Sequence, residues 1–245
     1  MILAAGLGTR LRPLTDDCPK ALVEINGRSL LEIALLRLRS FGVREVIVNV
    51  HHFADMVVDY LNANGNFDMR IEVSREDVLL DTGGGLKRAA HFFVEDASRR
   101  DEPFIVHNVD VLSNIDLDRM VQCHTESRAL ATLAVQDRKT SRYLLFDDQL
   151  QLCGRQAGSE PPEMVRACQQ PQPLAFSGIH VLSPRIFSLM TEDGAFPIVS
   201  SYVRLAAQKE KIVAFRADQY YWRDLGLPEN VAQAAQDLLR KVIVQ

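Results

Sequence analysis

Leu3-Ala4-Ala5-Gly6-Leu7-Gly8-Thr9-Arg10-Leu11-Arg12-Pro13-Leu14 opens the chain, and Pro19-Lys20 follows after a polar turn. A short apolar strand, predicted at residues 1–5, runs into two glycines and then into fixed cations. Backbone N–H groups at such a turn bind phosphate, and glycine lets the backbone approach the anion because it has no Cβ. The stretch therefore predicts a polyphosphate cradle made by Leu3, Ala4, Ala5, Gly6, Leu7, Gly8 and Thr9.

The cations of this stretch suit the same ligand. Arg10 and Arg12 carry guanidinium groups that donate two parallel hydrogen bonds to phosphate oxygens, and Lys20 adds a point charge. Leu11 stands where a dinucleotide-binding fingerprint has its third glycine, and no Gly-Lys-Ser/Thr ending is present. The turn is therefore neither a Rossmann fingerprint nor a Walker loop.

Composition excludes several classes of protein. The chain has 245 residues and a formal net charge of −4, without a long basic run, which argues against a nucleic-acid surface. Its four cysteines lack metal-site spacing, which favours reduced thiols in a cytoplasmic protein. The opening is too short for a signal peptide, and no apolar run approaches the roughly 20 residues of a membrane span. We expect a soluble monomer or homodimer.

The order of predicted elements indicates an α/β fold. Apolar strands at residues 46–50, 71–73 and 104–110 alternate with helical apolar spacing at 30–38 and 57–61. Such alternation predicts a parallel sheet of the doubly wound type, which binds ligands at the carboxyl ends of its strands. Later segments predict a hairpin across 147–149, a loop at 154–173, and a packing helix over 228–242.

Three glycines stand together in Asp81-Thr82-Gly83-Gly84-Gly85, ahead of a helix predicted at 86–93. One interpretation is a flexible loop. The other is that this backbone, poor in side chains, lies against a flat nucleobase and reads its edge. The second interpretation makes Asp81, Thr82, Gly83 and Gly84 nucleotide-binding residues.

Two aspartates end predicted strands or turns. Asp110 closes the strand at 104–110, where a parallel sheet opens, and this is a suitable place for a metal ligand. A turn or capping role is the simpler alternative. Asp224 lies in Trp222-Arg223-Asp224, and its alternatives are an ion pair with Arg223 or a cap for the last helix. His107 is expected to be a packed residue rather than a base.

The opening stretch resembles the signature of the sugar-1-phosphate nucleotidyltransferases, Leu-Ala-Ala-Gly-x-Gly-Thr-Arg-Leu-x-Pro-Leu-Thr followed by Pro-Lys, and it is unbroken here from Leu3 to Thr15. Asn108-Val109-Asp110 and Trp222-Arg223-Asp224-Leu225-Gly226 are similar to the family's two metal-binding segments. The resemblance implies a three-layer α/β/α, Rossmann-like (GT-A-like) fold with a mixed, mainly parallel central sheet. It implies one catalytic domain over 1–245, with a nucleotide-binding half at about 1–112 and a sugar-binding half at about 113–226.

The resemblance also implies roles for the residues. Arg10, Lys20, Asp110 and Asp224 would be catalytic, with Mg²⁺ held by Asp110 and Asp224. The sugar would meet Asn108, Ser177 and Gly178, and a glycine inside a strand such as 174–182 often marks a bulge or the close approach of a ligand. One departure stands out: many relatives carry Glu-Lys-Pro ahead of that strand, and this chain has Gln170-Pro171-Gln172-Pro173. The sugar-phosphate contact then rests on Lys20.

The implied reaction joins a nucleoside triphosphate to a sugar 1-phosphate and releases pyrophosphate. The pattern looks most like the N-acetylmuramate-1-phosphate uridylyltransferase branch, with UTP as the favoured nucleotide. A mannose-1-phosphate guanylyltransferase remains an alternative. So do an inactive nucleotide-sensing subunit on the same fold and a glycosyltransferase that uses Asn108-Val109-Asp110 as its metal motif.

Overall fold

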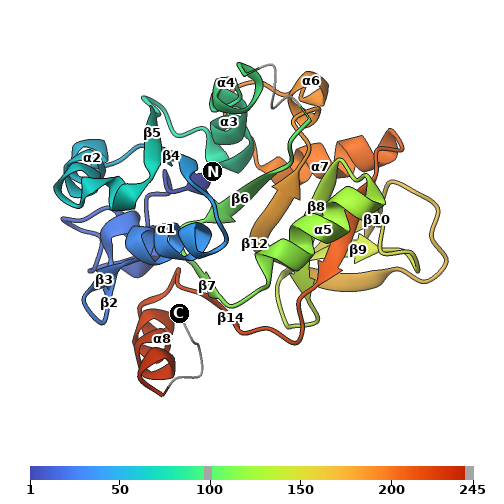
Figure 1. The fold of residues 1–245 in the computed structure, drawn as a ribbon. Coiled ribbons are helices and arrows are strands. Elements are labelled where there is room, and N and C mark those ends of the chain that lie inside the picture. Colours follow the sequence, from blue (N-terminus) through green and yellow to red (C-terminus); the bar gives the residue numbers. More distant parts are fainter. Residues whose placement is uncertain (97–100, 241–245) are drawn as a thin grey trace. The chain divides into compact units, whose positions relative to one another are not determined.

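The computed structural model describes residues 1–96 and 101–240 (Figure 1). The chain forms two compact units, each assembled from separate stretches of sequence. The first unit contains residues 1–81, 107–115 and 220–245, and the second contains residues 82–106 and 116–219. Strand β6 (Phe104–Asn108) begins in the second unit and ends in the first.

A parallel sheet forms the centre of the first unit. Strand β1 (Ile2–Leu3) pairs in parallel with β4 (Glu45–Val50) and with the end of β6, and β4 pairs in parallel with β5 (Arg70–Arg75). Ile2 lies opposite both Val48 and His107. The carboxyl ends of these strands therefore meet at one edge of the sheet, directly before the glycine turn.

The helices of the first unit have clear sequence causes. Helix α1 (Leu30–Ser40) follows a short hairpin of β2 (Glu24–Ile25) and β3 (Arg28–Ser29), and the Ser29 side chain accepts a hydrogen bond from the Glu32 N–H group. This is a standard N-cap arrangement. Helix α2 (Ala54–Ala63) follows β4. Short 3₁₀ turns occupy Thr9–Leu11, Lys20–Leu22 and Gly65–Asp68.

A second, two-stranded sheet completes the first unit. Strand β7 (Val111–Ser113) pairs antiparallel with β14 (Trp222–Asp224), which brings the end of the chain back to the Asp110 region. Helix α8 (Pro228–Leu239) follows β14, as Figure 1 shows. The predicted helix extended to residue 242, and its last two positions lie outside the described residues.

The second unit contains a mixed sheet. Strand β12 (Gln172–Leu182) pairs antiparallel with β8 (Ala131–Gln136) and with β9 (Arg142–Phe146), and β13 (Ile212–Arg216) pairs in parallel with β8. The predicted hairpin is confirmed, because β9 and β10 (Leu152–Ala157) pair antiparallel. The Asp147 carboxylate stabilises its turn by accepting the N–H groups of Gln149 and Gln151. The loop predicted at 154–173 is shorter than expected, since β10, β11 (Glu163–Met164) and β12 all enter it.

Helices surround the rest of the second unit. They are α4 (His91–Val94), α5 (Leu117–Ser127), α6 (Ile186–Leu189) and α7 (Ile198–Ala207). The Asp116 carboxylate caps α5 by accepting the N–H group of Arg119. Across the described residues, no helix is both long enough and apolar enough to cross a membrane.

The glycine tract is helical, and the predicted boundary was wrong. Helix α3 runs Asp81–Arg88, so Gly83, Gly84 and Gly85 lie inside it rather than in a loop before it. The N–H groups of Gly83 and Gly84 donate to the Phe196 carbonyl at 2.9 and 3.4 Å, and the Thr82 hydroxyl accepts the Ile198 N–H group at 3.0 Å. The starts of α3 and α7 thus cap each other, and this tertiary contact outweighs the low helix propensity of glycine.

Candidate active site

The first unit brings Asp110 and Asp224 together on paired backbone. Asp224 lies opposite Val111 in the β7–β14 pair, and the Leu225 N–H group donates to the Asp110 carbonyl at 2.8 Å. The two carboxyl-bearing residues are 114 positions apart in sequence, yet their backbones are hydrogen-bonded neighbours. Neither alternative for Asp224 is observed. Arg223 forms its ion pair with Asp237, and the N-cap residue of α8 is Leu227, with no side-chain cap hydrogen bond.

Lys20 reaches one of these aspartates. Its Nζ forms an ion pair with the Asp110 carboxylate, and both side chains are only 14% exposed. The glycine turn lies beside the stem of Lys20, since a Cβ placed on Gly8 would come 3.1 Å from the Lys20 Cβ and 2.9 Å from the Thr15 Cγ2. Gly8 has φ +66°, so a left-handed residue without a side chain is required at this point.

Arg10 lies beside the other aspartate. A Cβ placed on Gly226 would stand 2.6 Å from an Arg10 guanidinium nitrogen and 2.7 Å from Asp224 Oδ1. The Gly226 N–H group also donates to Asp224 Oδ1 at 2.6 Å. Glycine at 226 therefore leaves room for the guanidinium of Arg10 next to the carboxylate of Asp224.

Gly6 differs from these two glycines. A Cβ placed on it would meet no protein atom within 4 Å, and its backbone is not in the left-handed region. Nothing in the fold therefore requires glycine at this position. An exposed glycine with open space beside it, between Ala5 and the cations, leaves room for a ligand that approaches the backbone.

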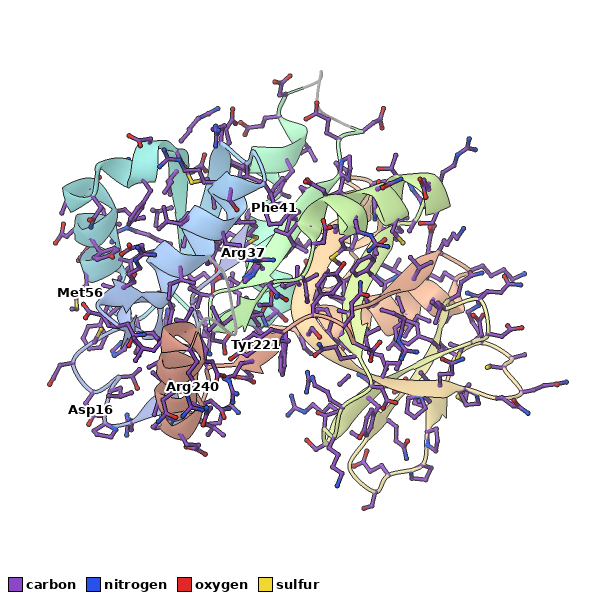
Figure 2. The ribbon with its side chains drawn as sticks, turned by 60° about the horizontal axis from the view of Figure 1, so that its bottom comes forward. Asp16, Arg37, Phe41, Met56, Tyr221 and Arg240 are labelled. Atoms are coloured by element: carbon purple, nitrogen blue, oxygen red, sulfur yellow. The ribbon has the colours of Figure 1, made fainter. Side chains whose placement is uncertain are left out.

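Side chains from two helices hold this region in place. Arg37 of α1 donates to the Ile115 carbonyl just after β7, and its guanidinium stacks 5.3 Å from the Phe41 ring centroid; both residues are labelled in Figure 2. Tyr221, also labelled there, donates its hydroxyl to Asp237 of α8 at 2.7 Å. The Asn230 side chain of α8 donates to the Asp224 carbonyl at 2.8 Å. Helix α8, expected only to pack, thus also contacts the backbone of Asp224.

His107 is a structural residue, as expected. It is 1% exposed, and Nδ1 lies 2.7 Å from the Asn108 carbonyl. Burial lowers the pKa of His107 to about 4, so its imidazole is neutral at pH 7. A neutral, enclosed imidazole is not available as a base on the open edge of the sheet.

Comparison with known proteins decides the class of this chain. Residues 1–241 match the nucleotidyl transferase family. The chain belongs to that family. The predicted sugar-1-phosphate nucleotidyltransferase resemblance is thereby confirmed, and the sites above belong to an enzyme of that family.

Two curated relatives differ in the nucleotide and the sugar that their names give. The N-acetylmuramate alpha-1-phosphate uridylyltransferase of Caulobacter vibrioides is 34% identical, with 94% of this chain and 92% of the relative covered. The mannose-1-phosphate guanyltransferase of Yarrowia lipolytica is 27% identical, with 94% of this chain but 61% of the relative covered. The transferase described here therefore spans about three fifths of the latter protein.

Solved structures confirm the fold class. A UDP-glucose pyrophosphorylase complexed with UDP-glucose matches with a TM-score of 0.77 at 19% identity, over 98% of this chain and 97% of that one. HddC from Yersinia pseudotuberculosis complexed with GMP-PN matches with a TM-score of 0.75 at 23% identity, over 97% of each chain. The fold is mixed α/β with a mainly parallel central sheet.

The predicted residues of the transferase fall into both units. Arg10, Lys20, Asp110 and Asp224 gather in the first unit with the glycine turn and with Asn108, which ends β6 opposite Leu3. Asp81, the first residue of the second stretch predicted to bind the nucleotide, also belongs to the first unit and has φ +57°.

The remaining predicted residues belong to the second unit. The N–H groups of Gly83 and Gly84 donate to the Phe196 carbonyl, and the Thr82 hydroxyl accepts the Ile198 N–H group. Nucleotide binding by Thr82, Gly83 and Gly84 stays a prediction. The bulge predicted at Gly178 is confirmed by a register shift between Phe176 and His180 and by φ +73°. Ser177 is 0% exposed, so its hydroxyl is not presented to a sugar in this conformation. Sugar binding at Ser177 and Gly178 stays a prediction.

The residues present fit a magnesium ion. No group of three or more His, Cys, Asp or Glu that could hold a metal occurs within residues 1–96 and 101–240, so the protein would offer the two carboxylates of Asp110 and Asp224. Mg²⁺ is usually held by one or two carboxylates together with substrate phosphates and water. Two carboxylates next to the turn predicted to bind phosphate match that requirement.

Sequence reasoning missed two buried polar residues of the transferase. Asn49, at 2% exposure, accepts the Ala4 N–H group through Oδ1 at 2.8 Å, and its Nδ2 donates to Glu76 Oε1 at 2.6 Å. Asn49 lies in an otherwise apolar run, Val46-Ile47-Val48-Asn49-Val50. An amide at the carboxyl end of a buried strand was the available signal, because a buried polar group needs partners.

Proposed function

We propose that this enzyme transfers a uridylyl group from UTP to N-acetylmuramate 1-phosphate. A phosphate oxygen of the sugar phosphate forms a bond to the α-phosphorus of UTP. The bond from that phosphorus to the bridging oxygen of the β-phosphate breaks, and pyrophosphate leaves with the electron pair. The products are the UDP-sugar and pyrophosphate.

This chemistry needs no protein nucleophile and no general base, because the attacking phosphate is already an anion. The barrier lies in bringing two anions together and in stabilising charge on the transferring phosphoryl group and the leaving group. Arg10 would bind the β- and γ-phosphates, and Lys20 would contact the α-phosphate and the incoming sugar phosphate. Asp110 and Asp224 would hold Mg²⁺, which neutralises phosphate charge when bound.

One observation carries the proposal: Leu225 bonds to the backbone of Asp110, so the two proposed metal ligands belong to one local structure. Lys20 pairs with Asp110 and Arg10 lies against Gly226, so both cations stand beside these carboxylates. A nucleotide sensor would not need all four groups. Their joint presence favours a catalyst.

The choice of substrates is supported by the 34% identical uridylyltransferase, which is covered over nearly its whole length. The mannose-1-phosphate guanylyltransferase alternative is supported by relatives at 26% to 28% identity, which are covered over 61% to 65% of their length. The uridylyltransferase has the higher sequence identity and is matched over more of its own length. We therefore place UTP and N-acetylmuramate 1-phosphate first and GTP with mannose 1-phosphate second.

The test is pyrophosphate release by the purified chain with Mg²⁺, using four nucleoside triphosphates crossed with several sugar 1-phosphates. The proposal expects the fastest release with UTP and N-acetylmuramate 1-phosphate. Faster release with GTP and mannose 1-phosphate would select the alternative substrates. No release with any pair would indicate a sensor, and sugar transfer from a finished nucleotide sugar without pyrophosphate would indicate a glycosyltransferase.

Two variants test whether the activity depends on the candidate site. Asp110→Asn keeps the shape of the side chain but removes a charge from the proposed metal site. We expect release to fall by about 10²–10³, the usual effect of removing one contact that stabilises a transition state. Asp59→Asn, on the exposed face of α2, is the matched control and should leave release unchanged.

A further inference from the structure

Two buried polar side chains connect the glycine turn to the backbone that leads into Asp81. Asn49 Oδ1 accepts the Ala4 N–H group at 2.8 Å, and Asn49 Nδ2 donates to Glu76 Oε1 at 2.6 Å. Glu76 Oε2 accepts the Leu80 N–H group at 2.9 Å. A continuous chain of three hydrogen bonds therefore runs from Ala4 to Leu80.

This chain of bonds is enclosed and fixed at both ends. Glu76 is 4% exposed, and burial of a carboxylate is costly unless hydrogen bonds compensate. The Glu76 backbone is held as well, because its N–H group donates to the Val50 carbonyl at 2.8 Å and its carbonyl lies 2.8 Å from His51 Nδ1. The position of Glu76 is thus set by the end of β4 rather than by solvent.

A carboxylate is the side chain that this position needs. Each of its two oxygens accepts from a different donor, one from Asn49 and one from Leu80. A glutamine offers one accepting oxygen and one donating NH₂ group, so it must lose one of these two bonds. Glu76→Gln therefore separates the two halves of the chain of bonds while the volume stays the same.

We propose that Asn49 and Glu76 are positioning residues that couple triphosphate binding at the glycine turn to base binding at Asp81, which directly follows Leu80. The proposal rests on the proposed function, in which the triphosphate lies at the turn, and on the prediction from the sequence that Asp81 binds the base. Because Ala4 and Leu80 are tied through two side chains, a ligand that orders one segment orders the other. A nucleoside triphosphate, which has both the phosphates and the base, then gains binding free energy from both segments.

The experiment compares UTP with inorganic tripolyphosphate, each with Mg²⁺, by isothermal titration calorimetry. Tripolyphosphate has the phosphates but no base. We expect Glu76→Gln to weaken UTP binding about tenfold and tripolyphosphate binding less than about twofold, as loss of one well-placed hydrogen bond would do. An equal loss for both ligands, or no loss for either, would overturn the coupling.

Glu45→Gln is the matched control. It makes the same chemical change in the first unit, at an ion pair in which Arg70 lies 3.2 Å from the carboxylate and is 72% exposed. Exposed pairs of this kind contribute little to stability. Glu45→Gln should therefore bind both ligands as the unchanged protein does.

A second measurement uses the unchanged protein, so it does not require any variant to fold. Hydrogen exchange of the unchanged protein should show slower exchange of the Leu80 amide when tripolyphosphate binds, although this ligand has no base. Unaltered exchange at Leu80 under saturating tripolyphosphate would refute the coupling. Failure of the proposed function would be seen separately, as binding of both ligands without release of pyrophosphate from UTP in the presence of any sugar 1-phosphate.

Discussion

Gly6→Ala should raise the stability of the protein and weaken its binding of UTP. The added Cβ meets no protein atom within 4 Å, and the Gly6 backbone is not in the left-handed region. Replacing glycine at a compatible site stabilises a protein by about 0.4–1 kcal/mol, because the unfolded chain loses freedom. For a chain of this size that corresponds to a rise in Tm of about 1–4 °C.

The same methyl group should obstruct the ligand. If the triphosphate lies against the backbone at Gly6, the Cβ occupies part of its space. Forcing an extra methyl group into a packed contact costs about 1–3 kcal/mol, which corresponds to binding weakened about 5- to 150-fold. Calorimetric titration with UTP and Mg²⁺ measures the affinity, and thermal melting without ligand measures the stability.

Gly8→Ala is the contrasting variant. Gly8 has φ +66°, and its Cβ would lie 2.9 Å from the Thr15 Cγ2, so this change should lower stability. The two glycines stand two residues apart, and the predicted stability changes have opposite signs. If Gly6→Ala bound UTP as tightly as the unchanged protein does, the idea of a backbone cradle at Gly6 would be refuted.

Three further outcomes are expected. Gly83→Ala should lower stability by about 2 kcal/mol in chemical denaturation, because its Cβ would come 2.3 Å from the Phe196 ring and 2.8 Å from the Phe196 carbonyl, which outweighs the helix propensity gained; a neutral result would contradict the close packing of α3. Asp224→Asn should reduce pyrophosphate release by about 10²–10³ with little change in Tm, and full activity would remove Asp224 from the site. Burial lowers the pKa of His107 and of His124 to about 4, so the unfolded chain binds more protons between pH 6.5 and 4. Stability should therefore be complete above pH 6.5 and fall by about 2–3 kcal/mol per histidine as the pH drops to 4; denaturation curves that coincide at pH 7 and pH 5 would refute this.

Local sequence predicted the part of the site that depends on residue type at fixed spacing. The glycine turn, Arg10 and Lys20 stand within one short stretch. Asp110 lies in the turn after β6, a strand that its apolar run predicts, although that prediction extended the strand to residue 110. The proximity of Asp224 to Asp110 came only from the family pattern. In the structure it rests on the β7–β14 pairing, a long-range contact that no local pattern reveals.

What the sequence did not predict depends on contacts between distant segments. Three consecutive glycines favour a loop by intrinsic propensity, and the helix at Asp81–Arg88 exists because the Phe196 carbonyl and the Thr82 hydroxyl join two helix starts. No local pattern reveals the contact between Glu76 and Asn49, since Asn49 lies on β4, 27 residues earlier in the sequence. Tertiary hydrogen bonds decided both cases.

The mutual capping of α3 and α7 also governs how the chain folds during synthesis. The start of α3 lacks its partner until the ribosome has released Ile198, which is 116 residues later than Thr82. The β7–β14 pair likewise waits for Trp222–Asp224. Each unit therefore lacks one of these contacts until the chain has been synthesised past residue 198 or residue 224, so nascent chains that stall before residue 198 should be sensitive to proteases and should depend on chaperones.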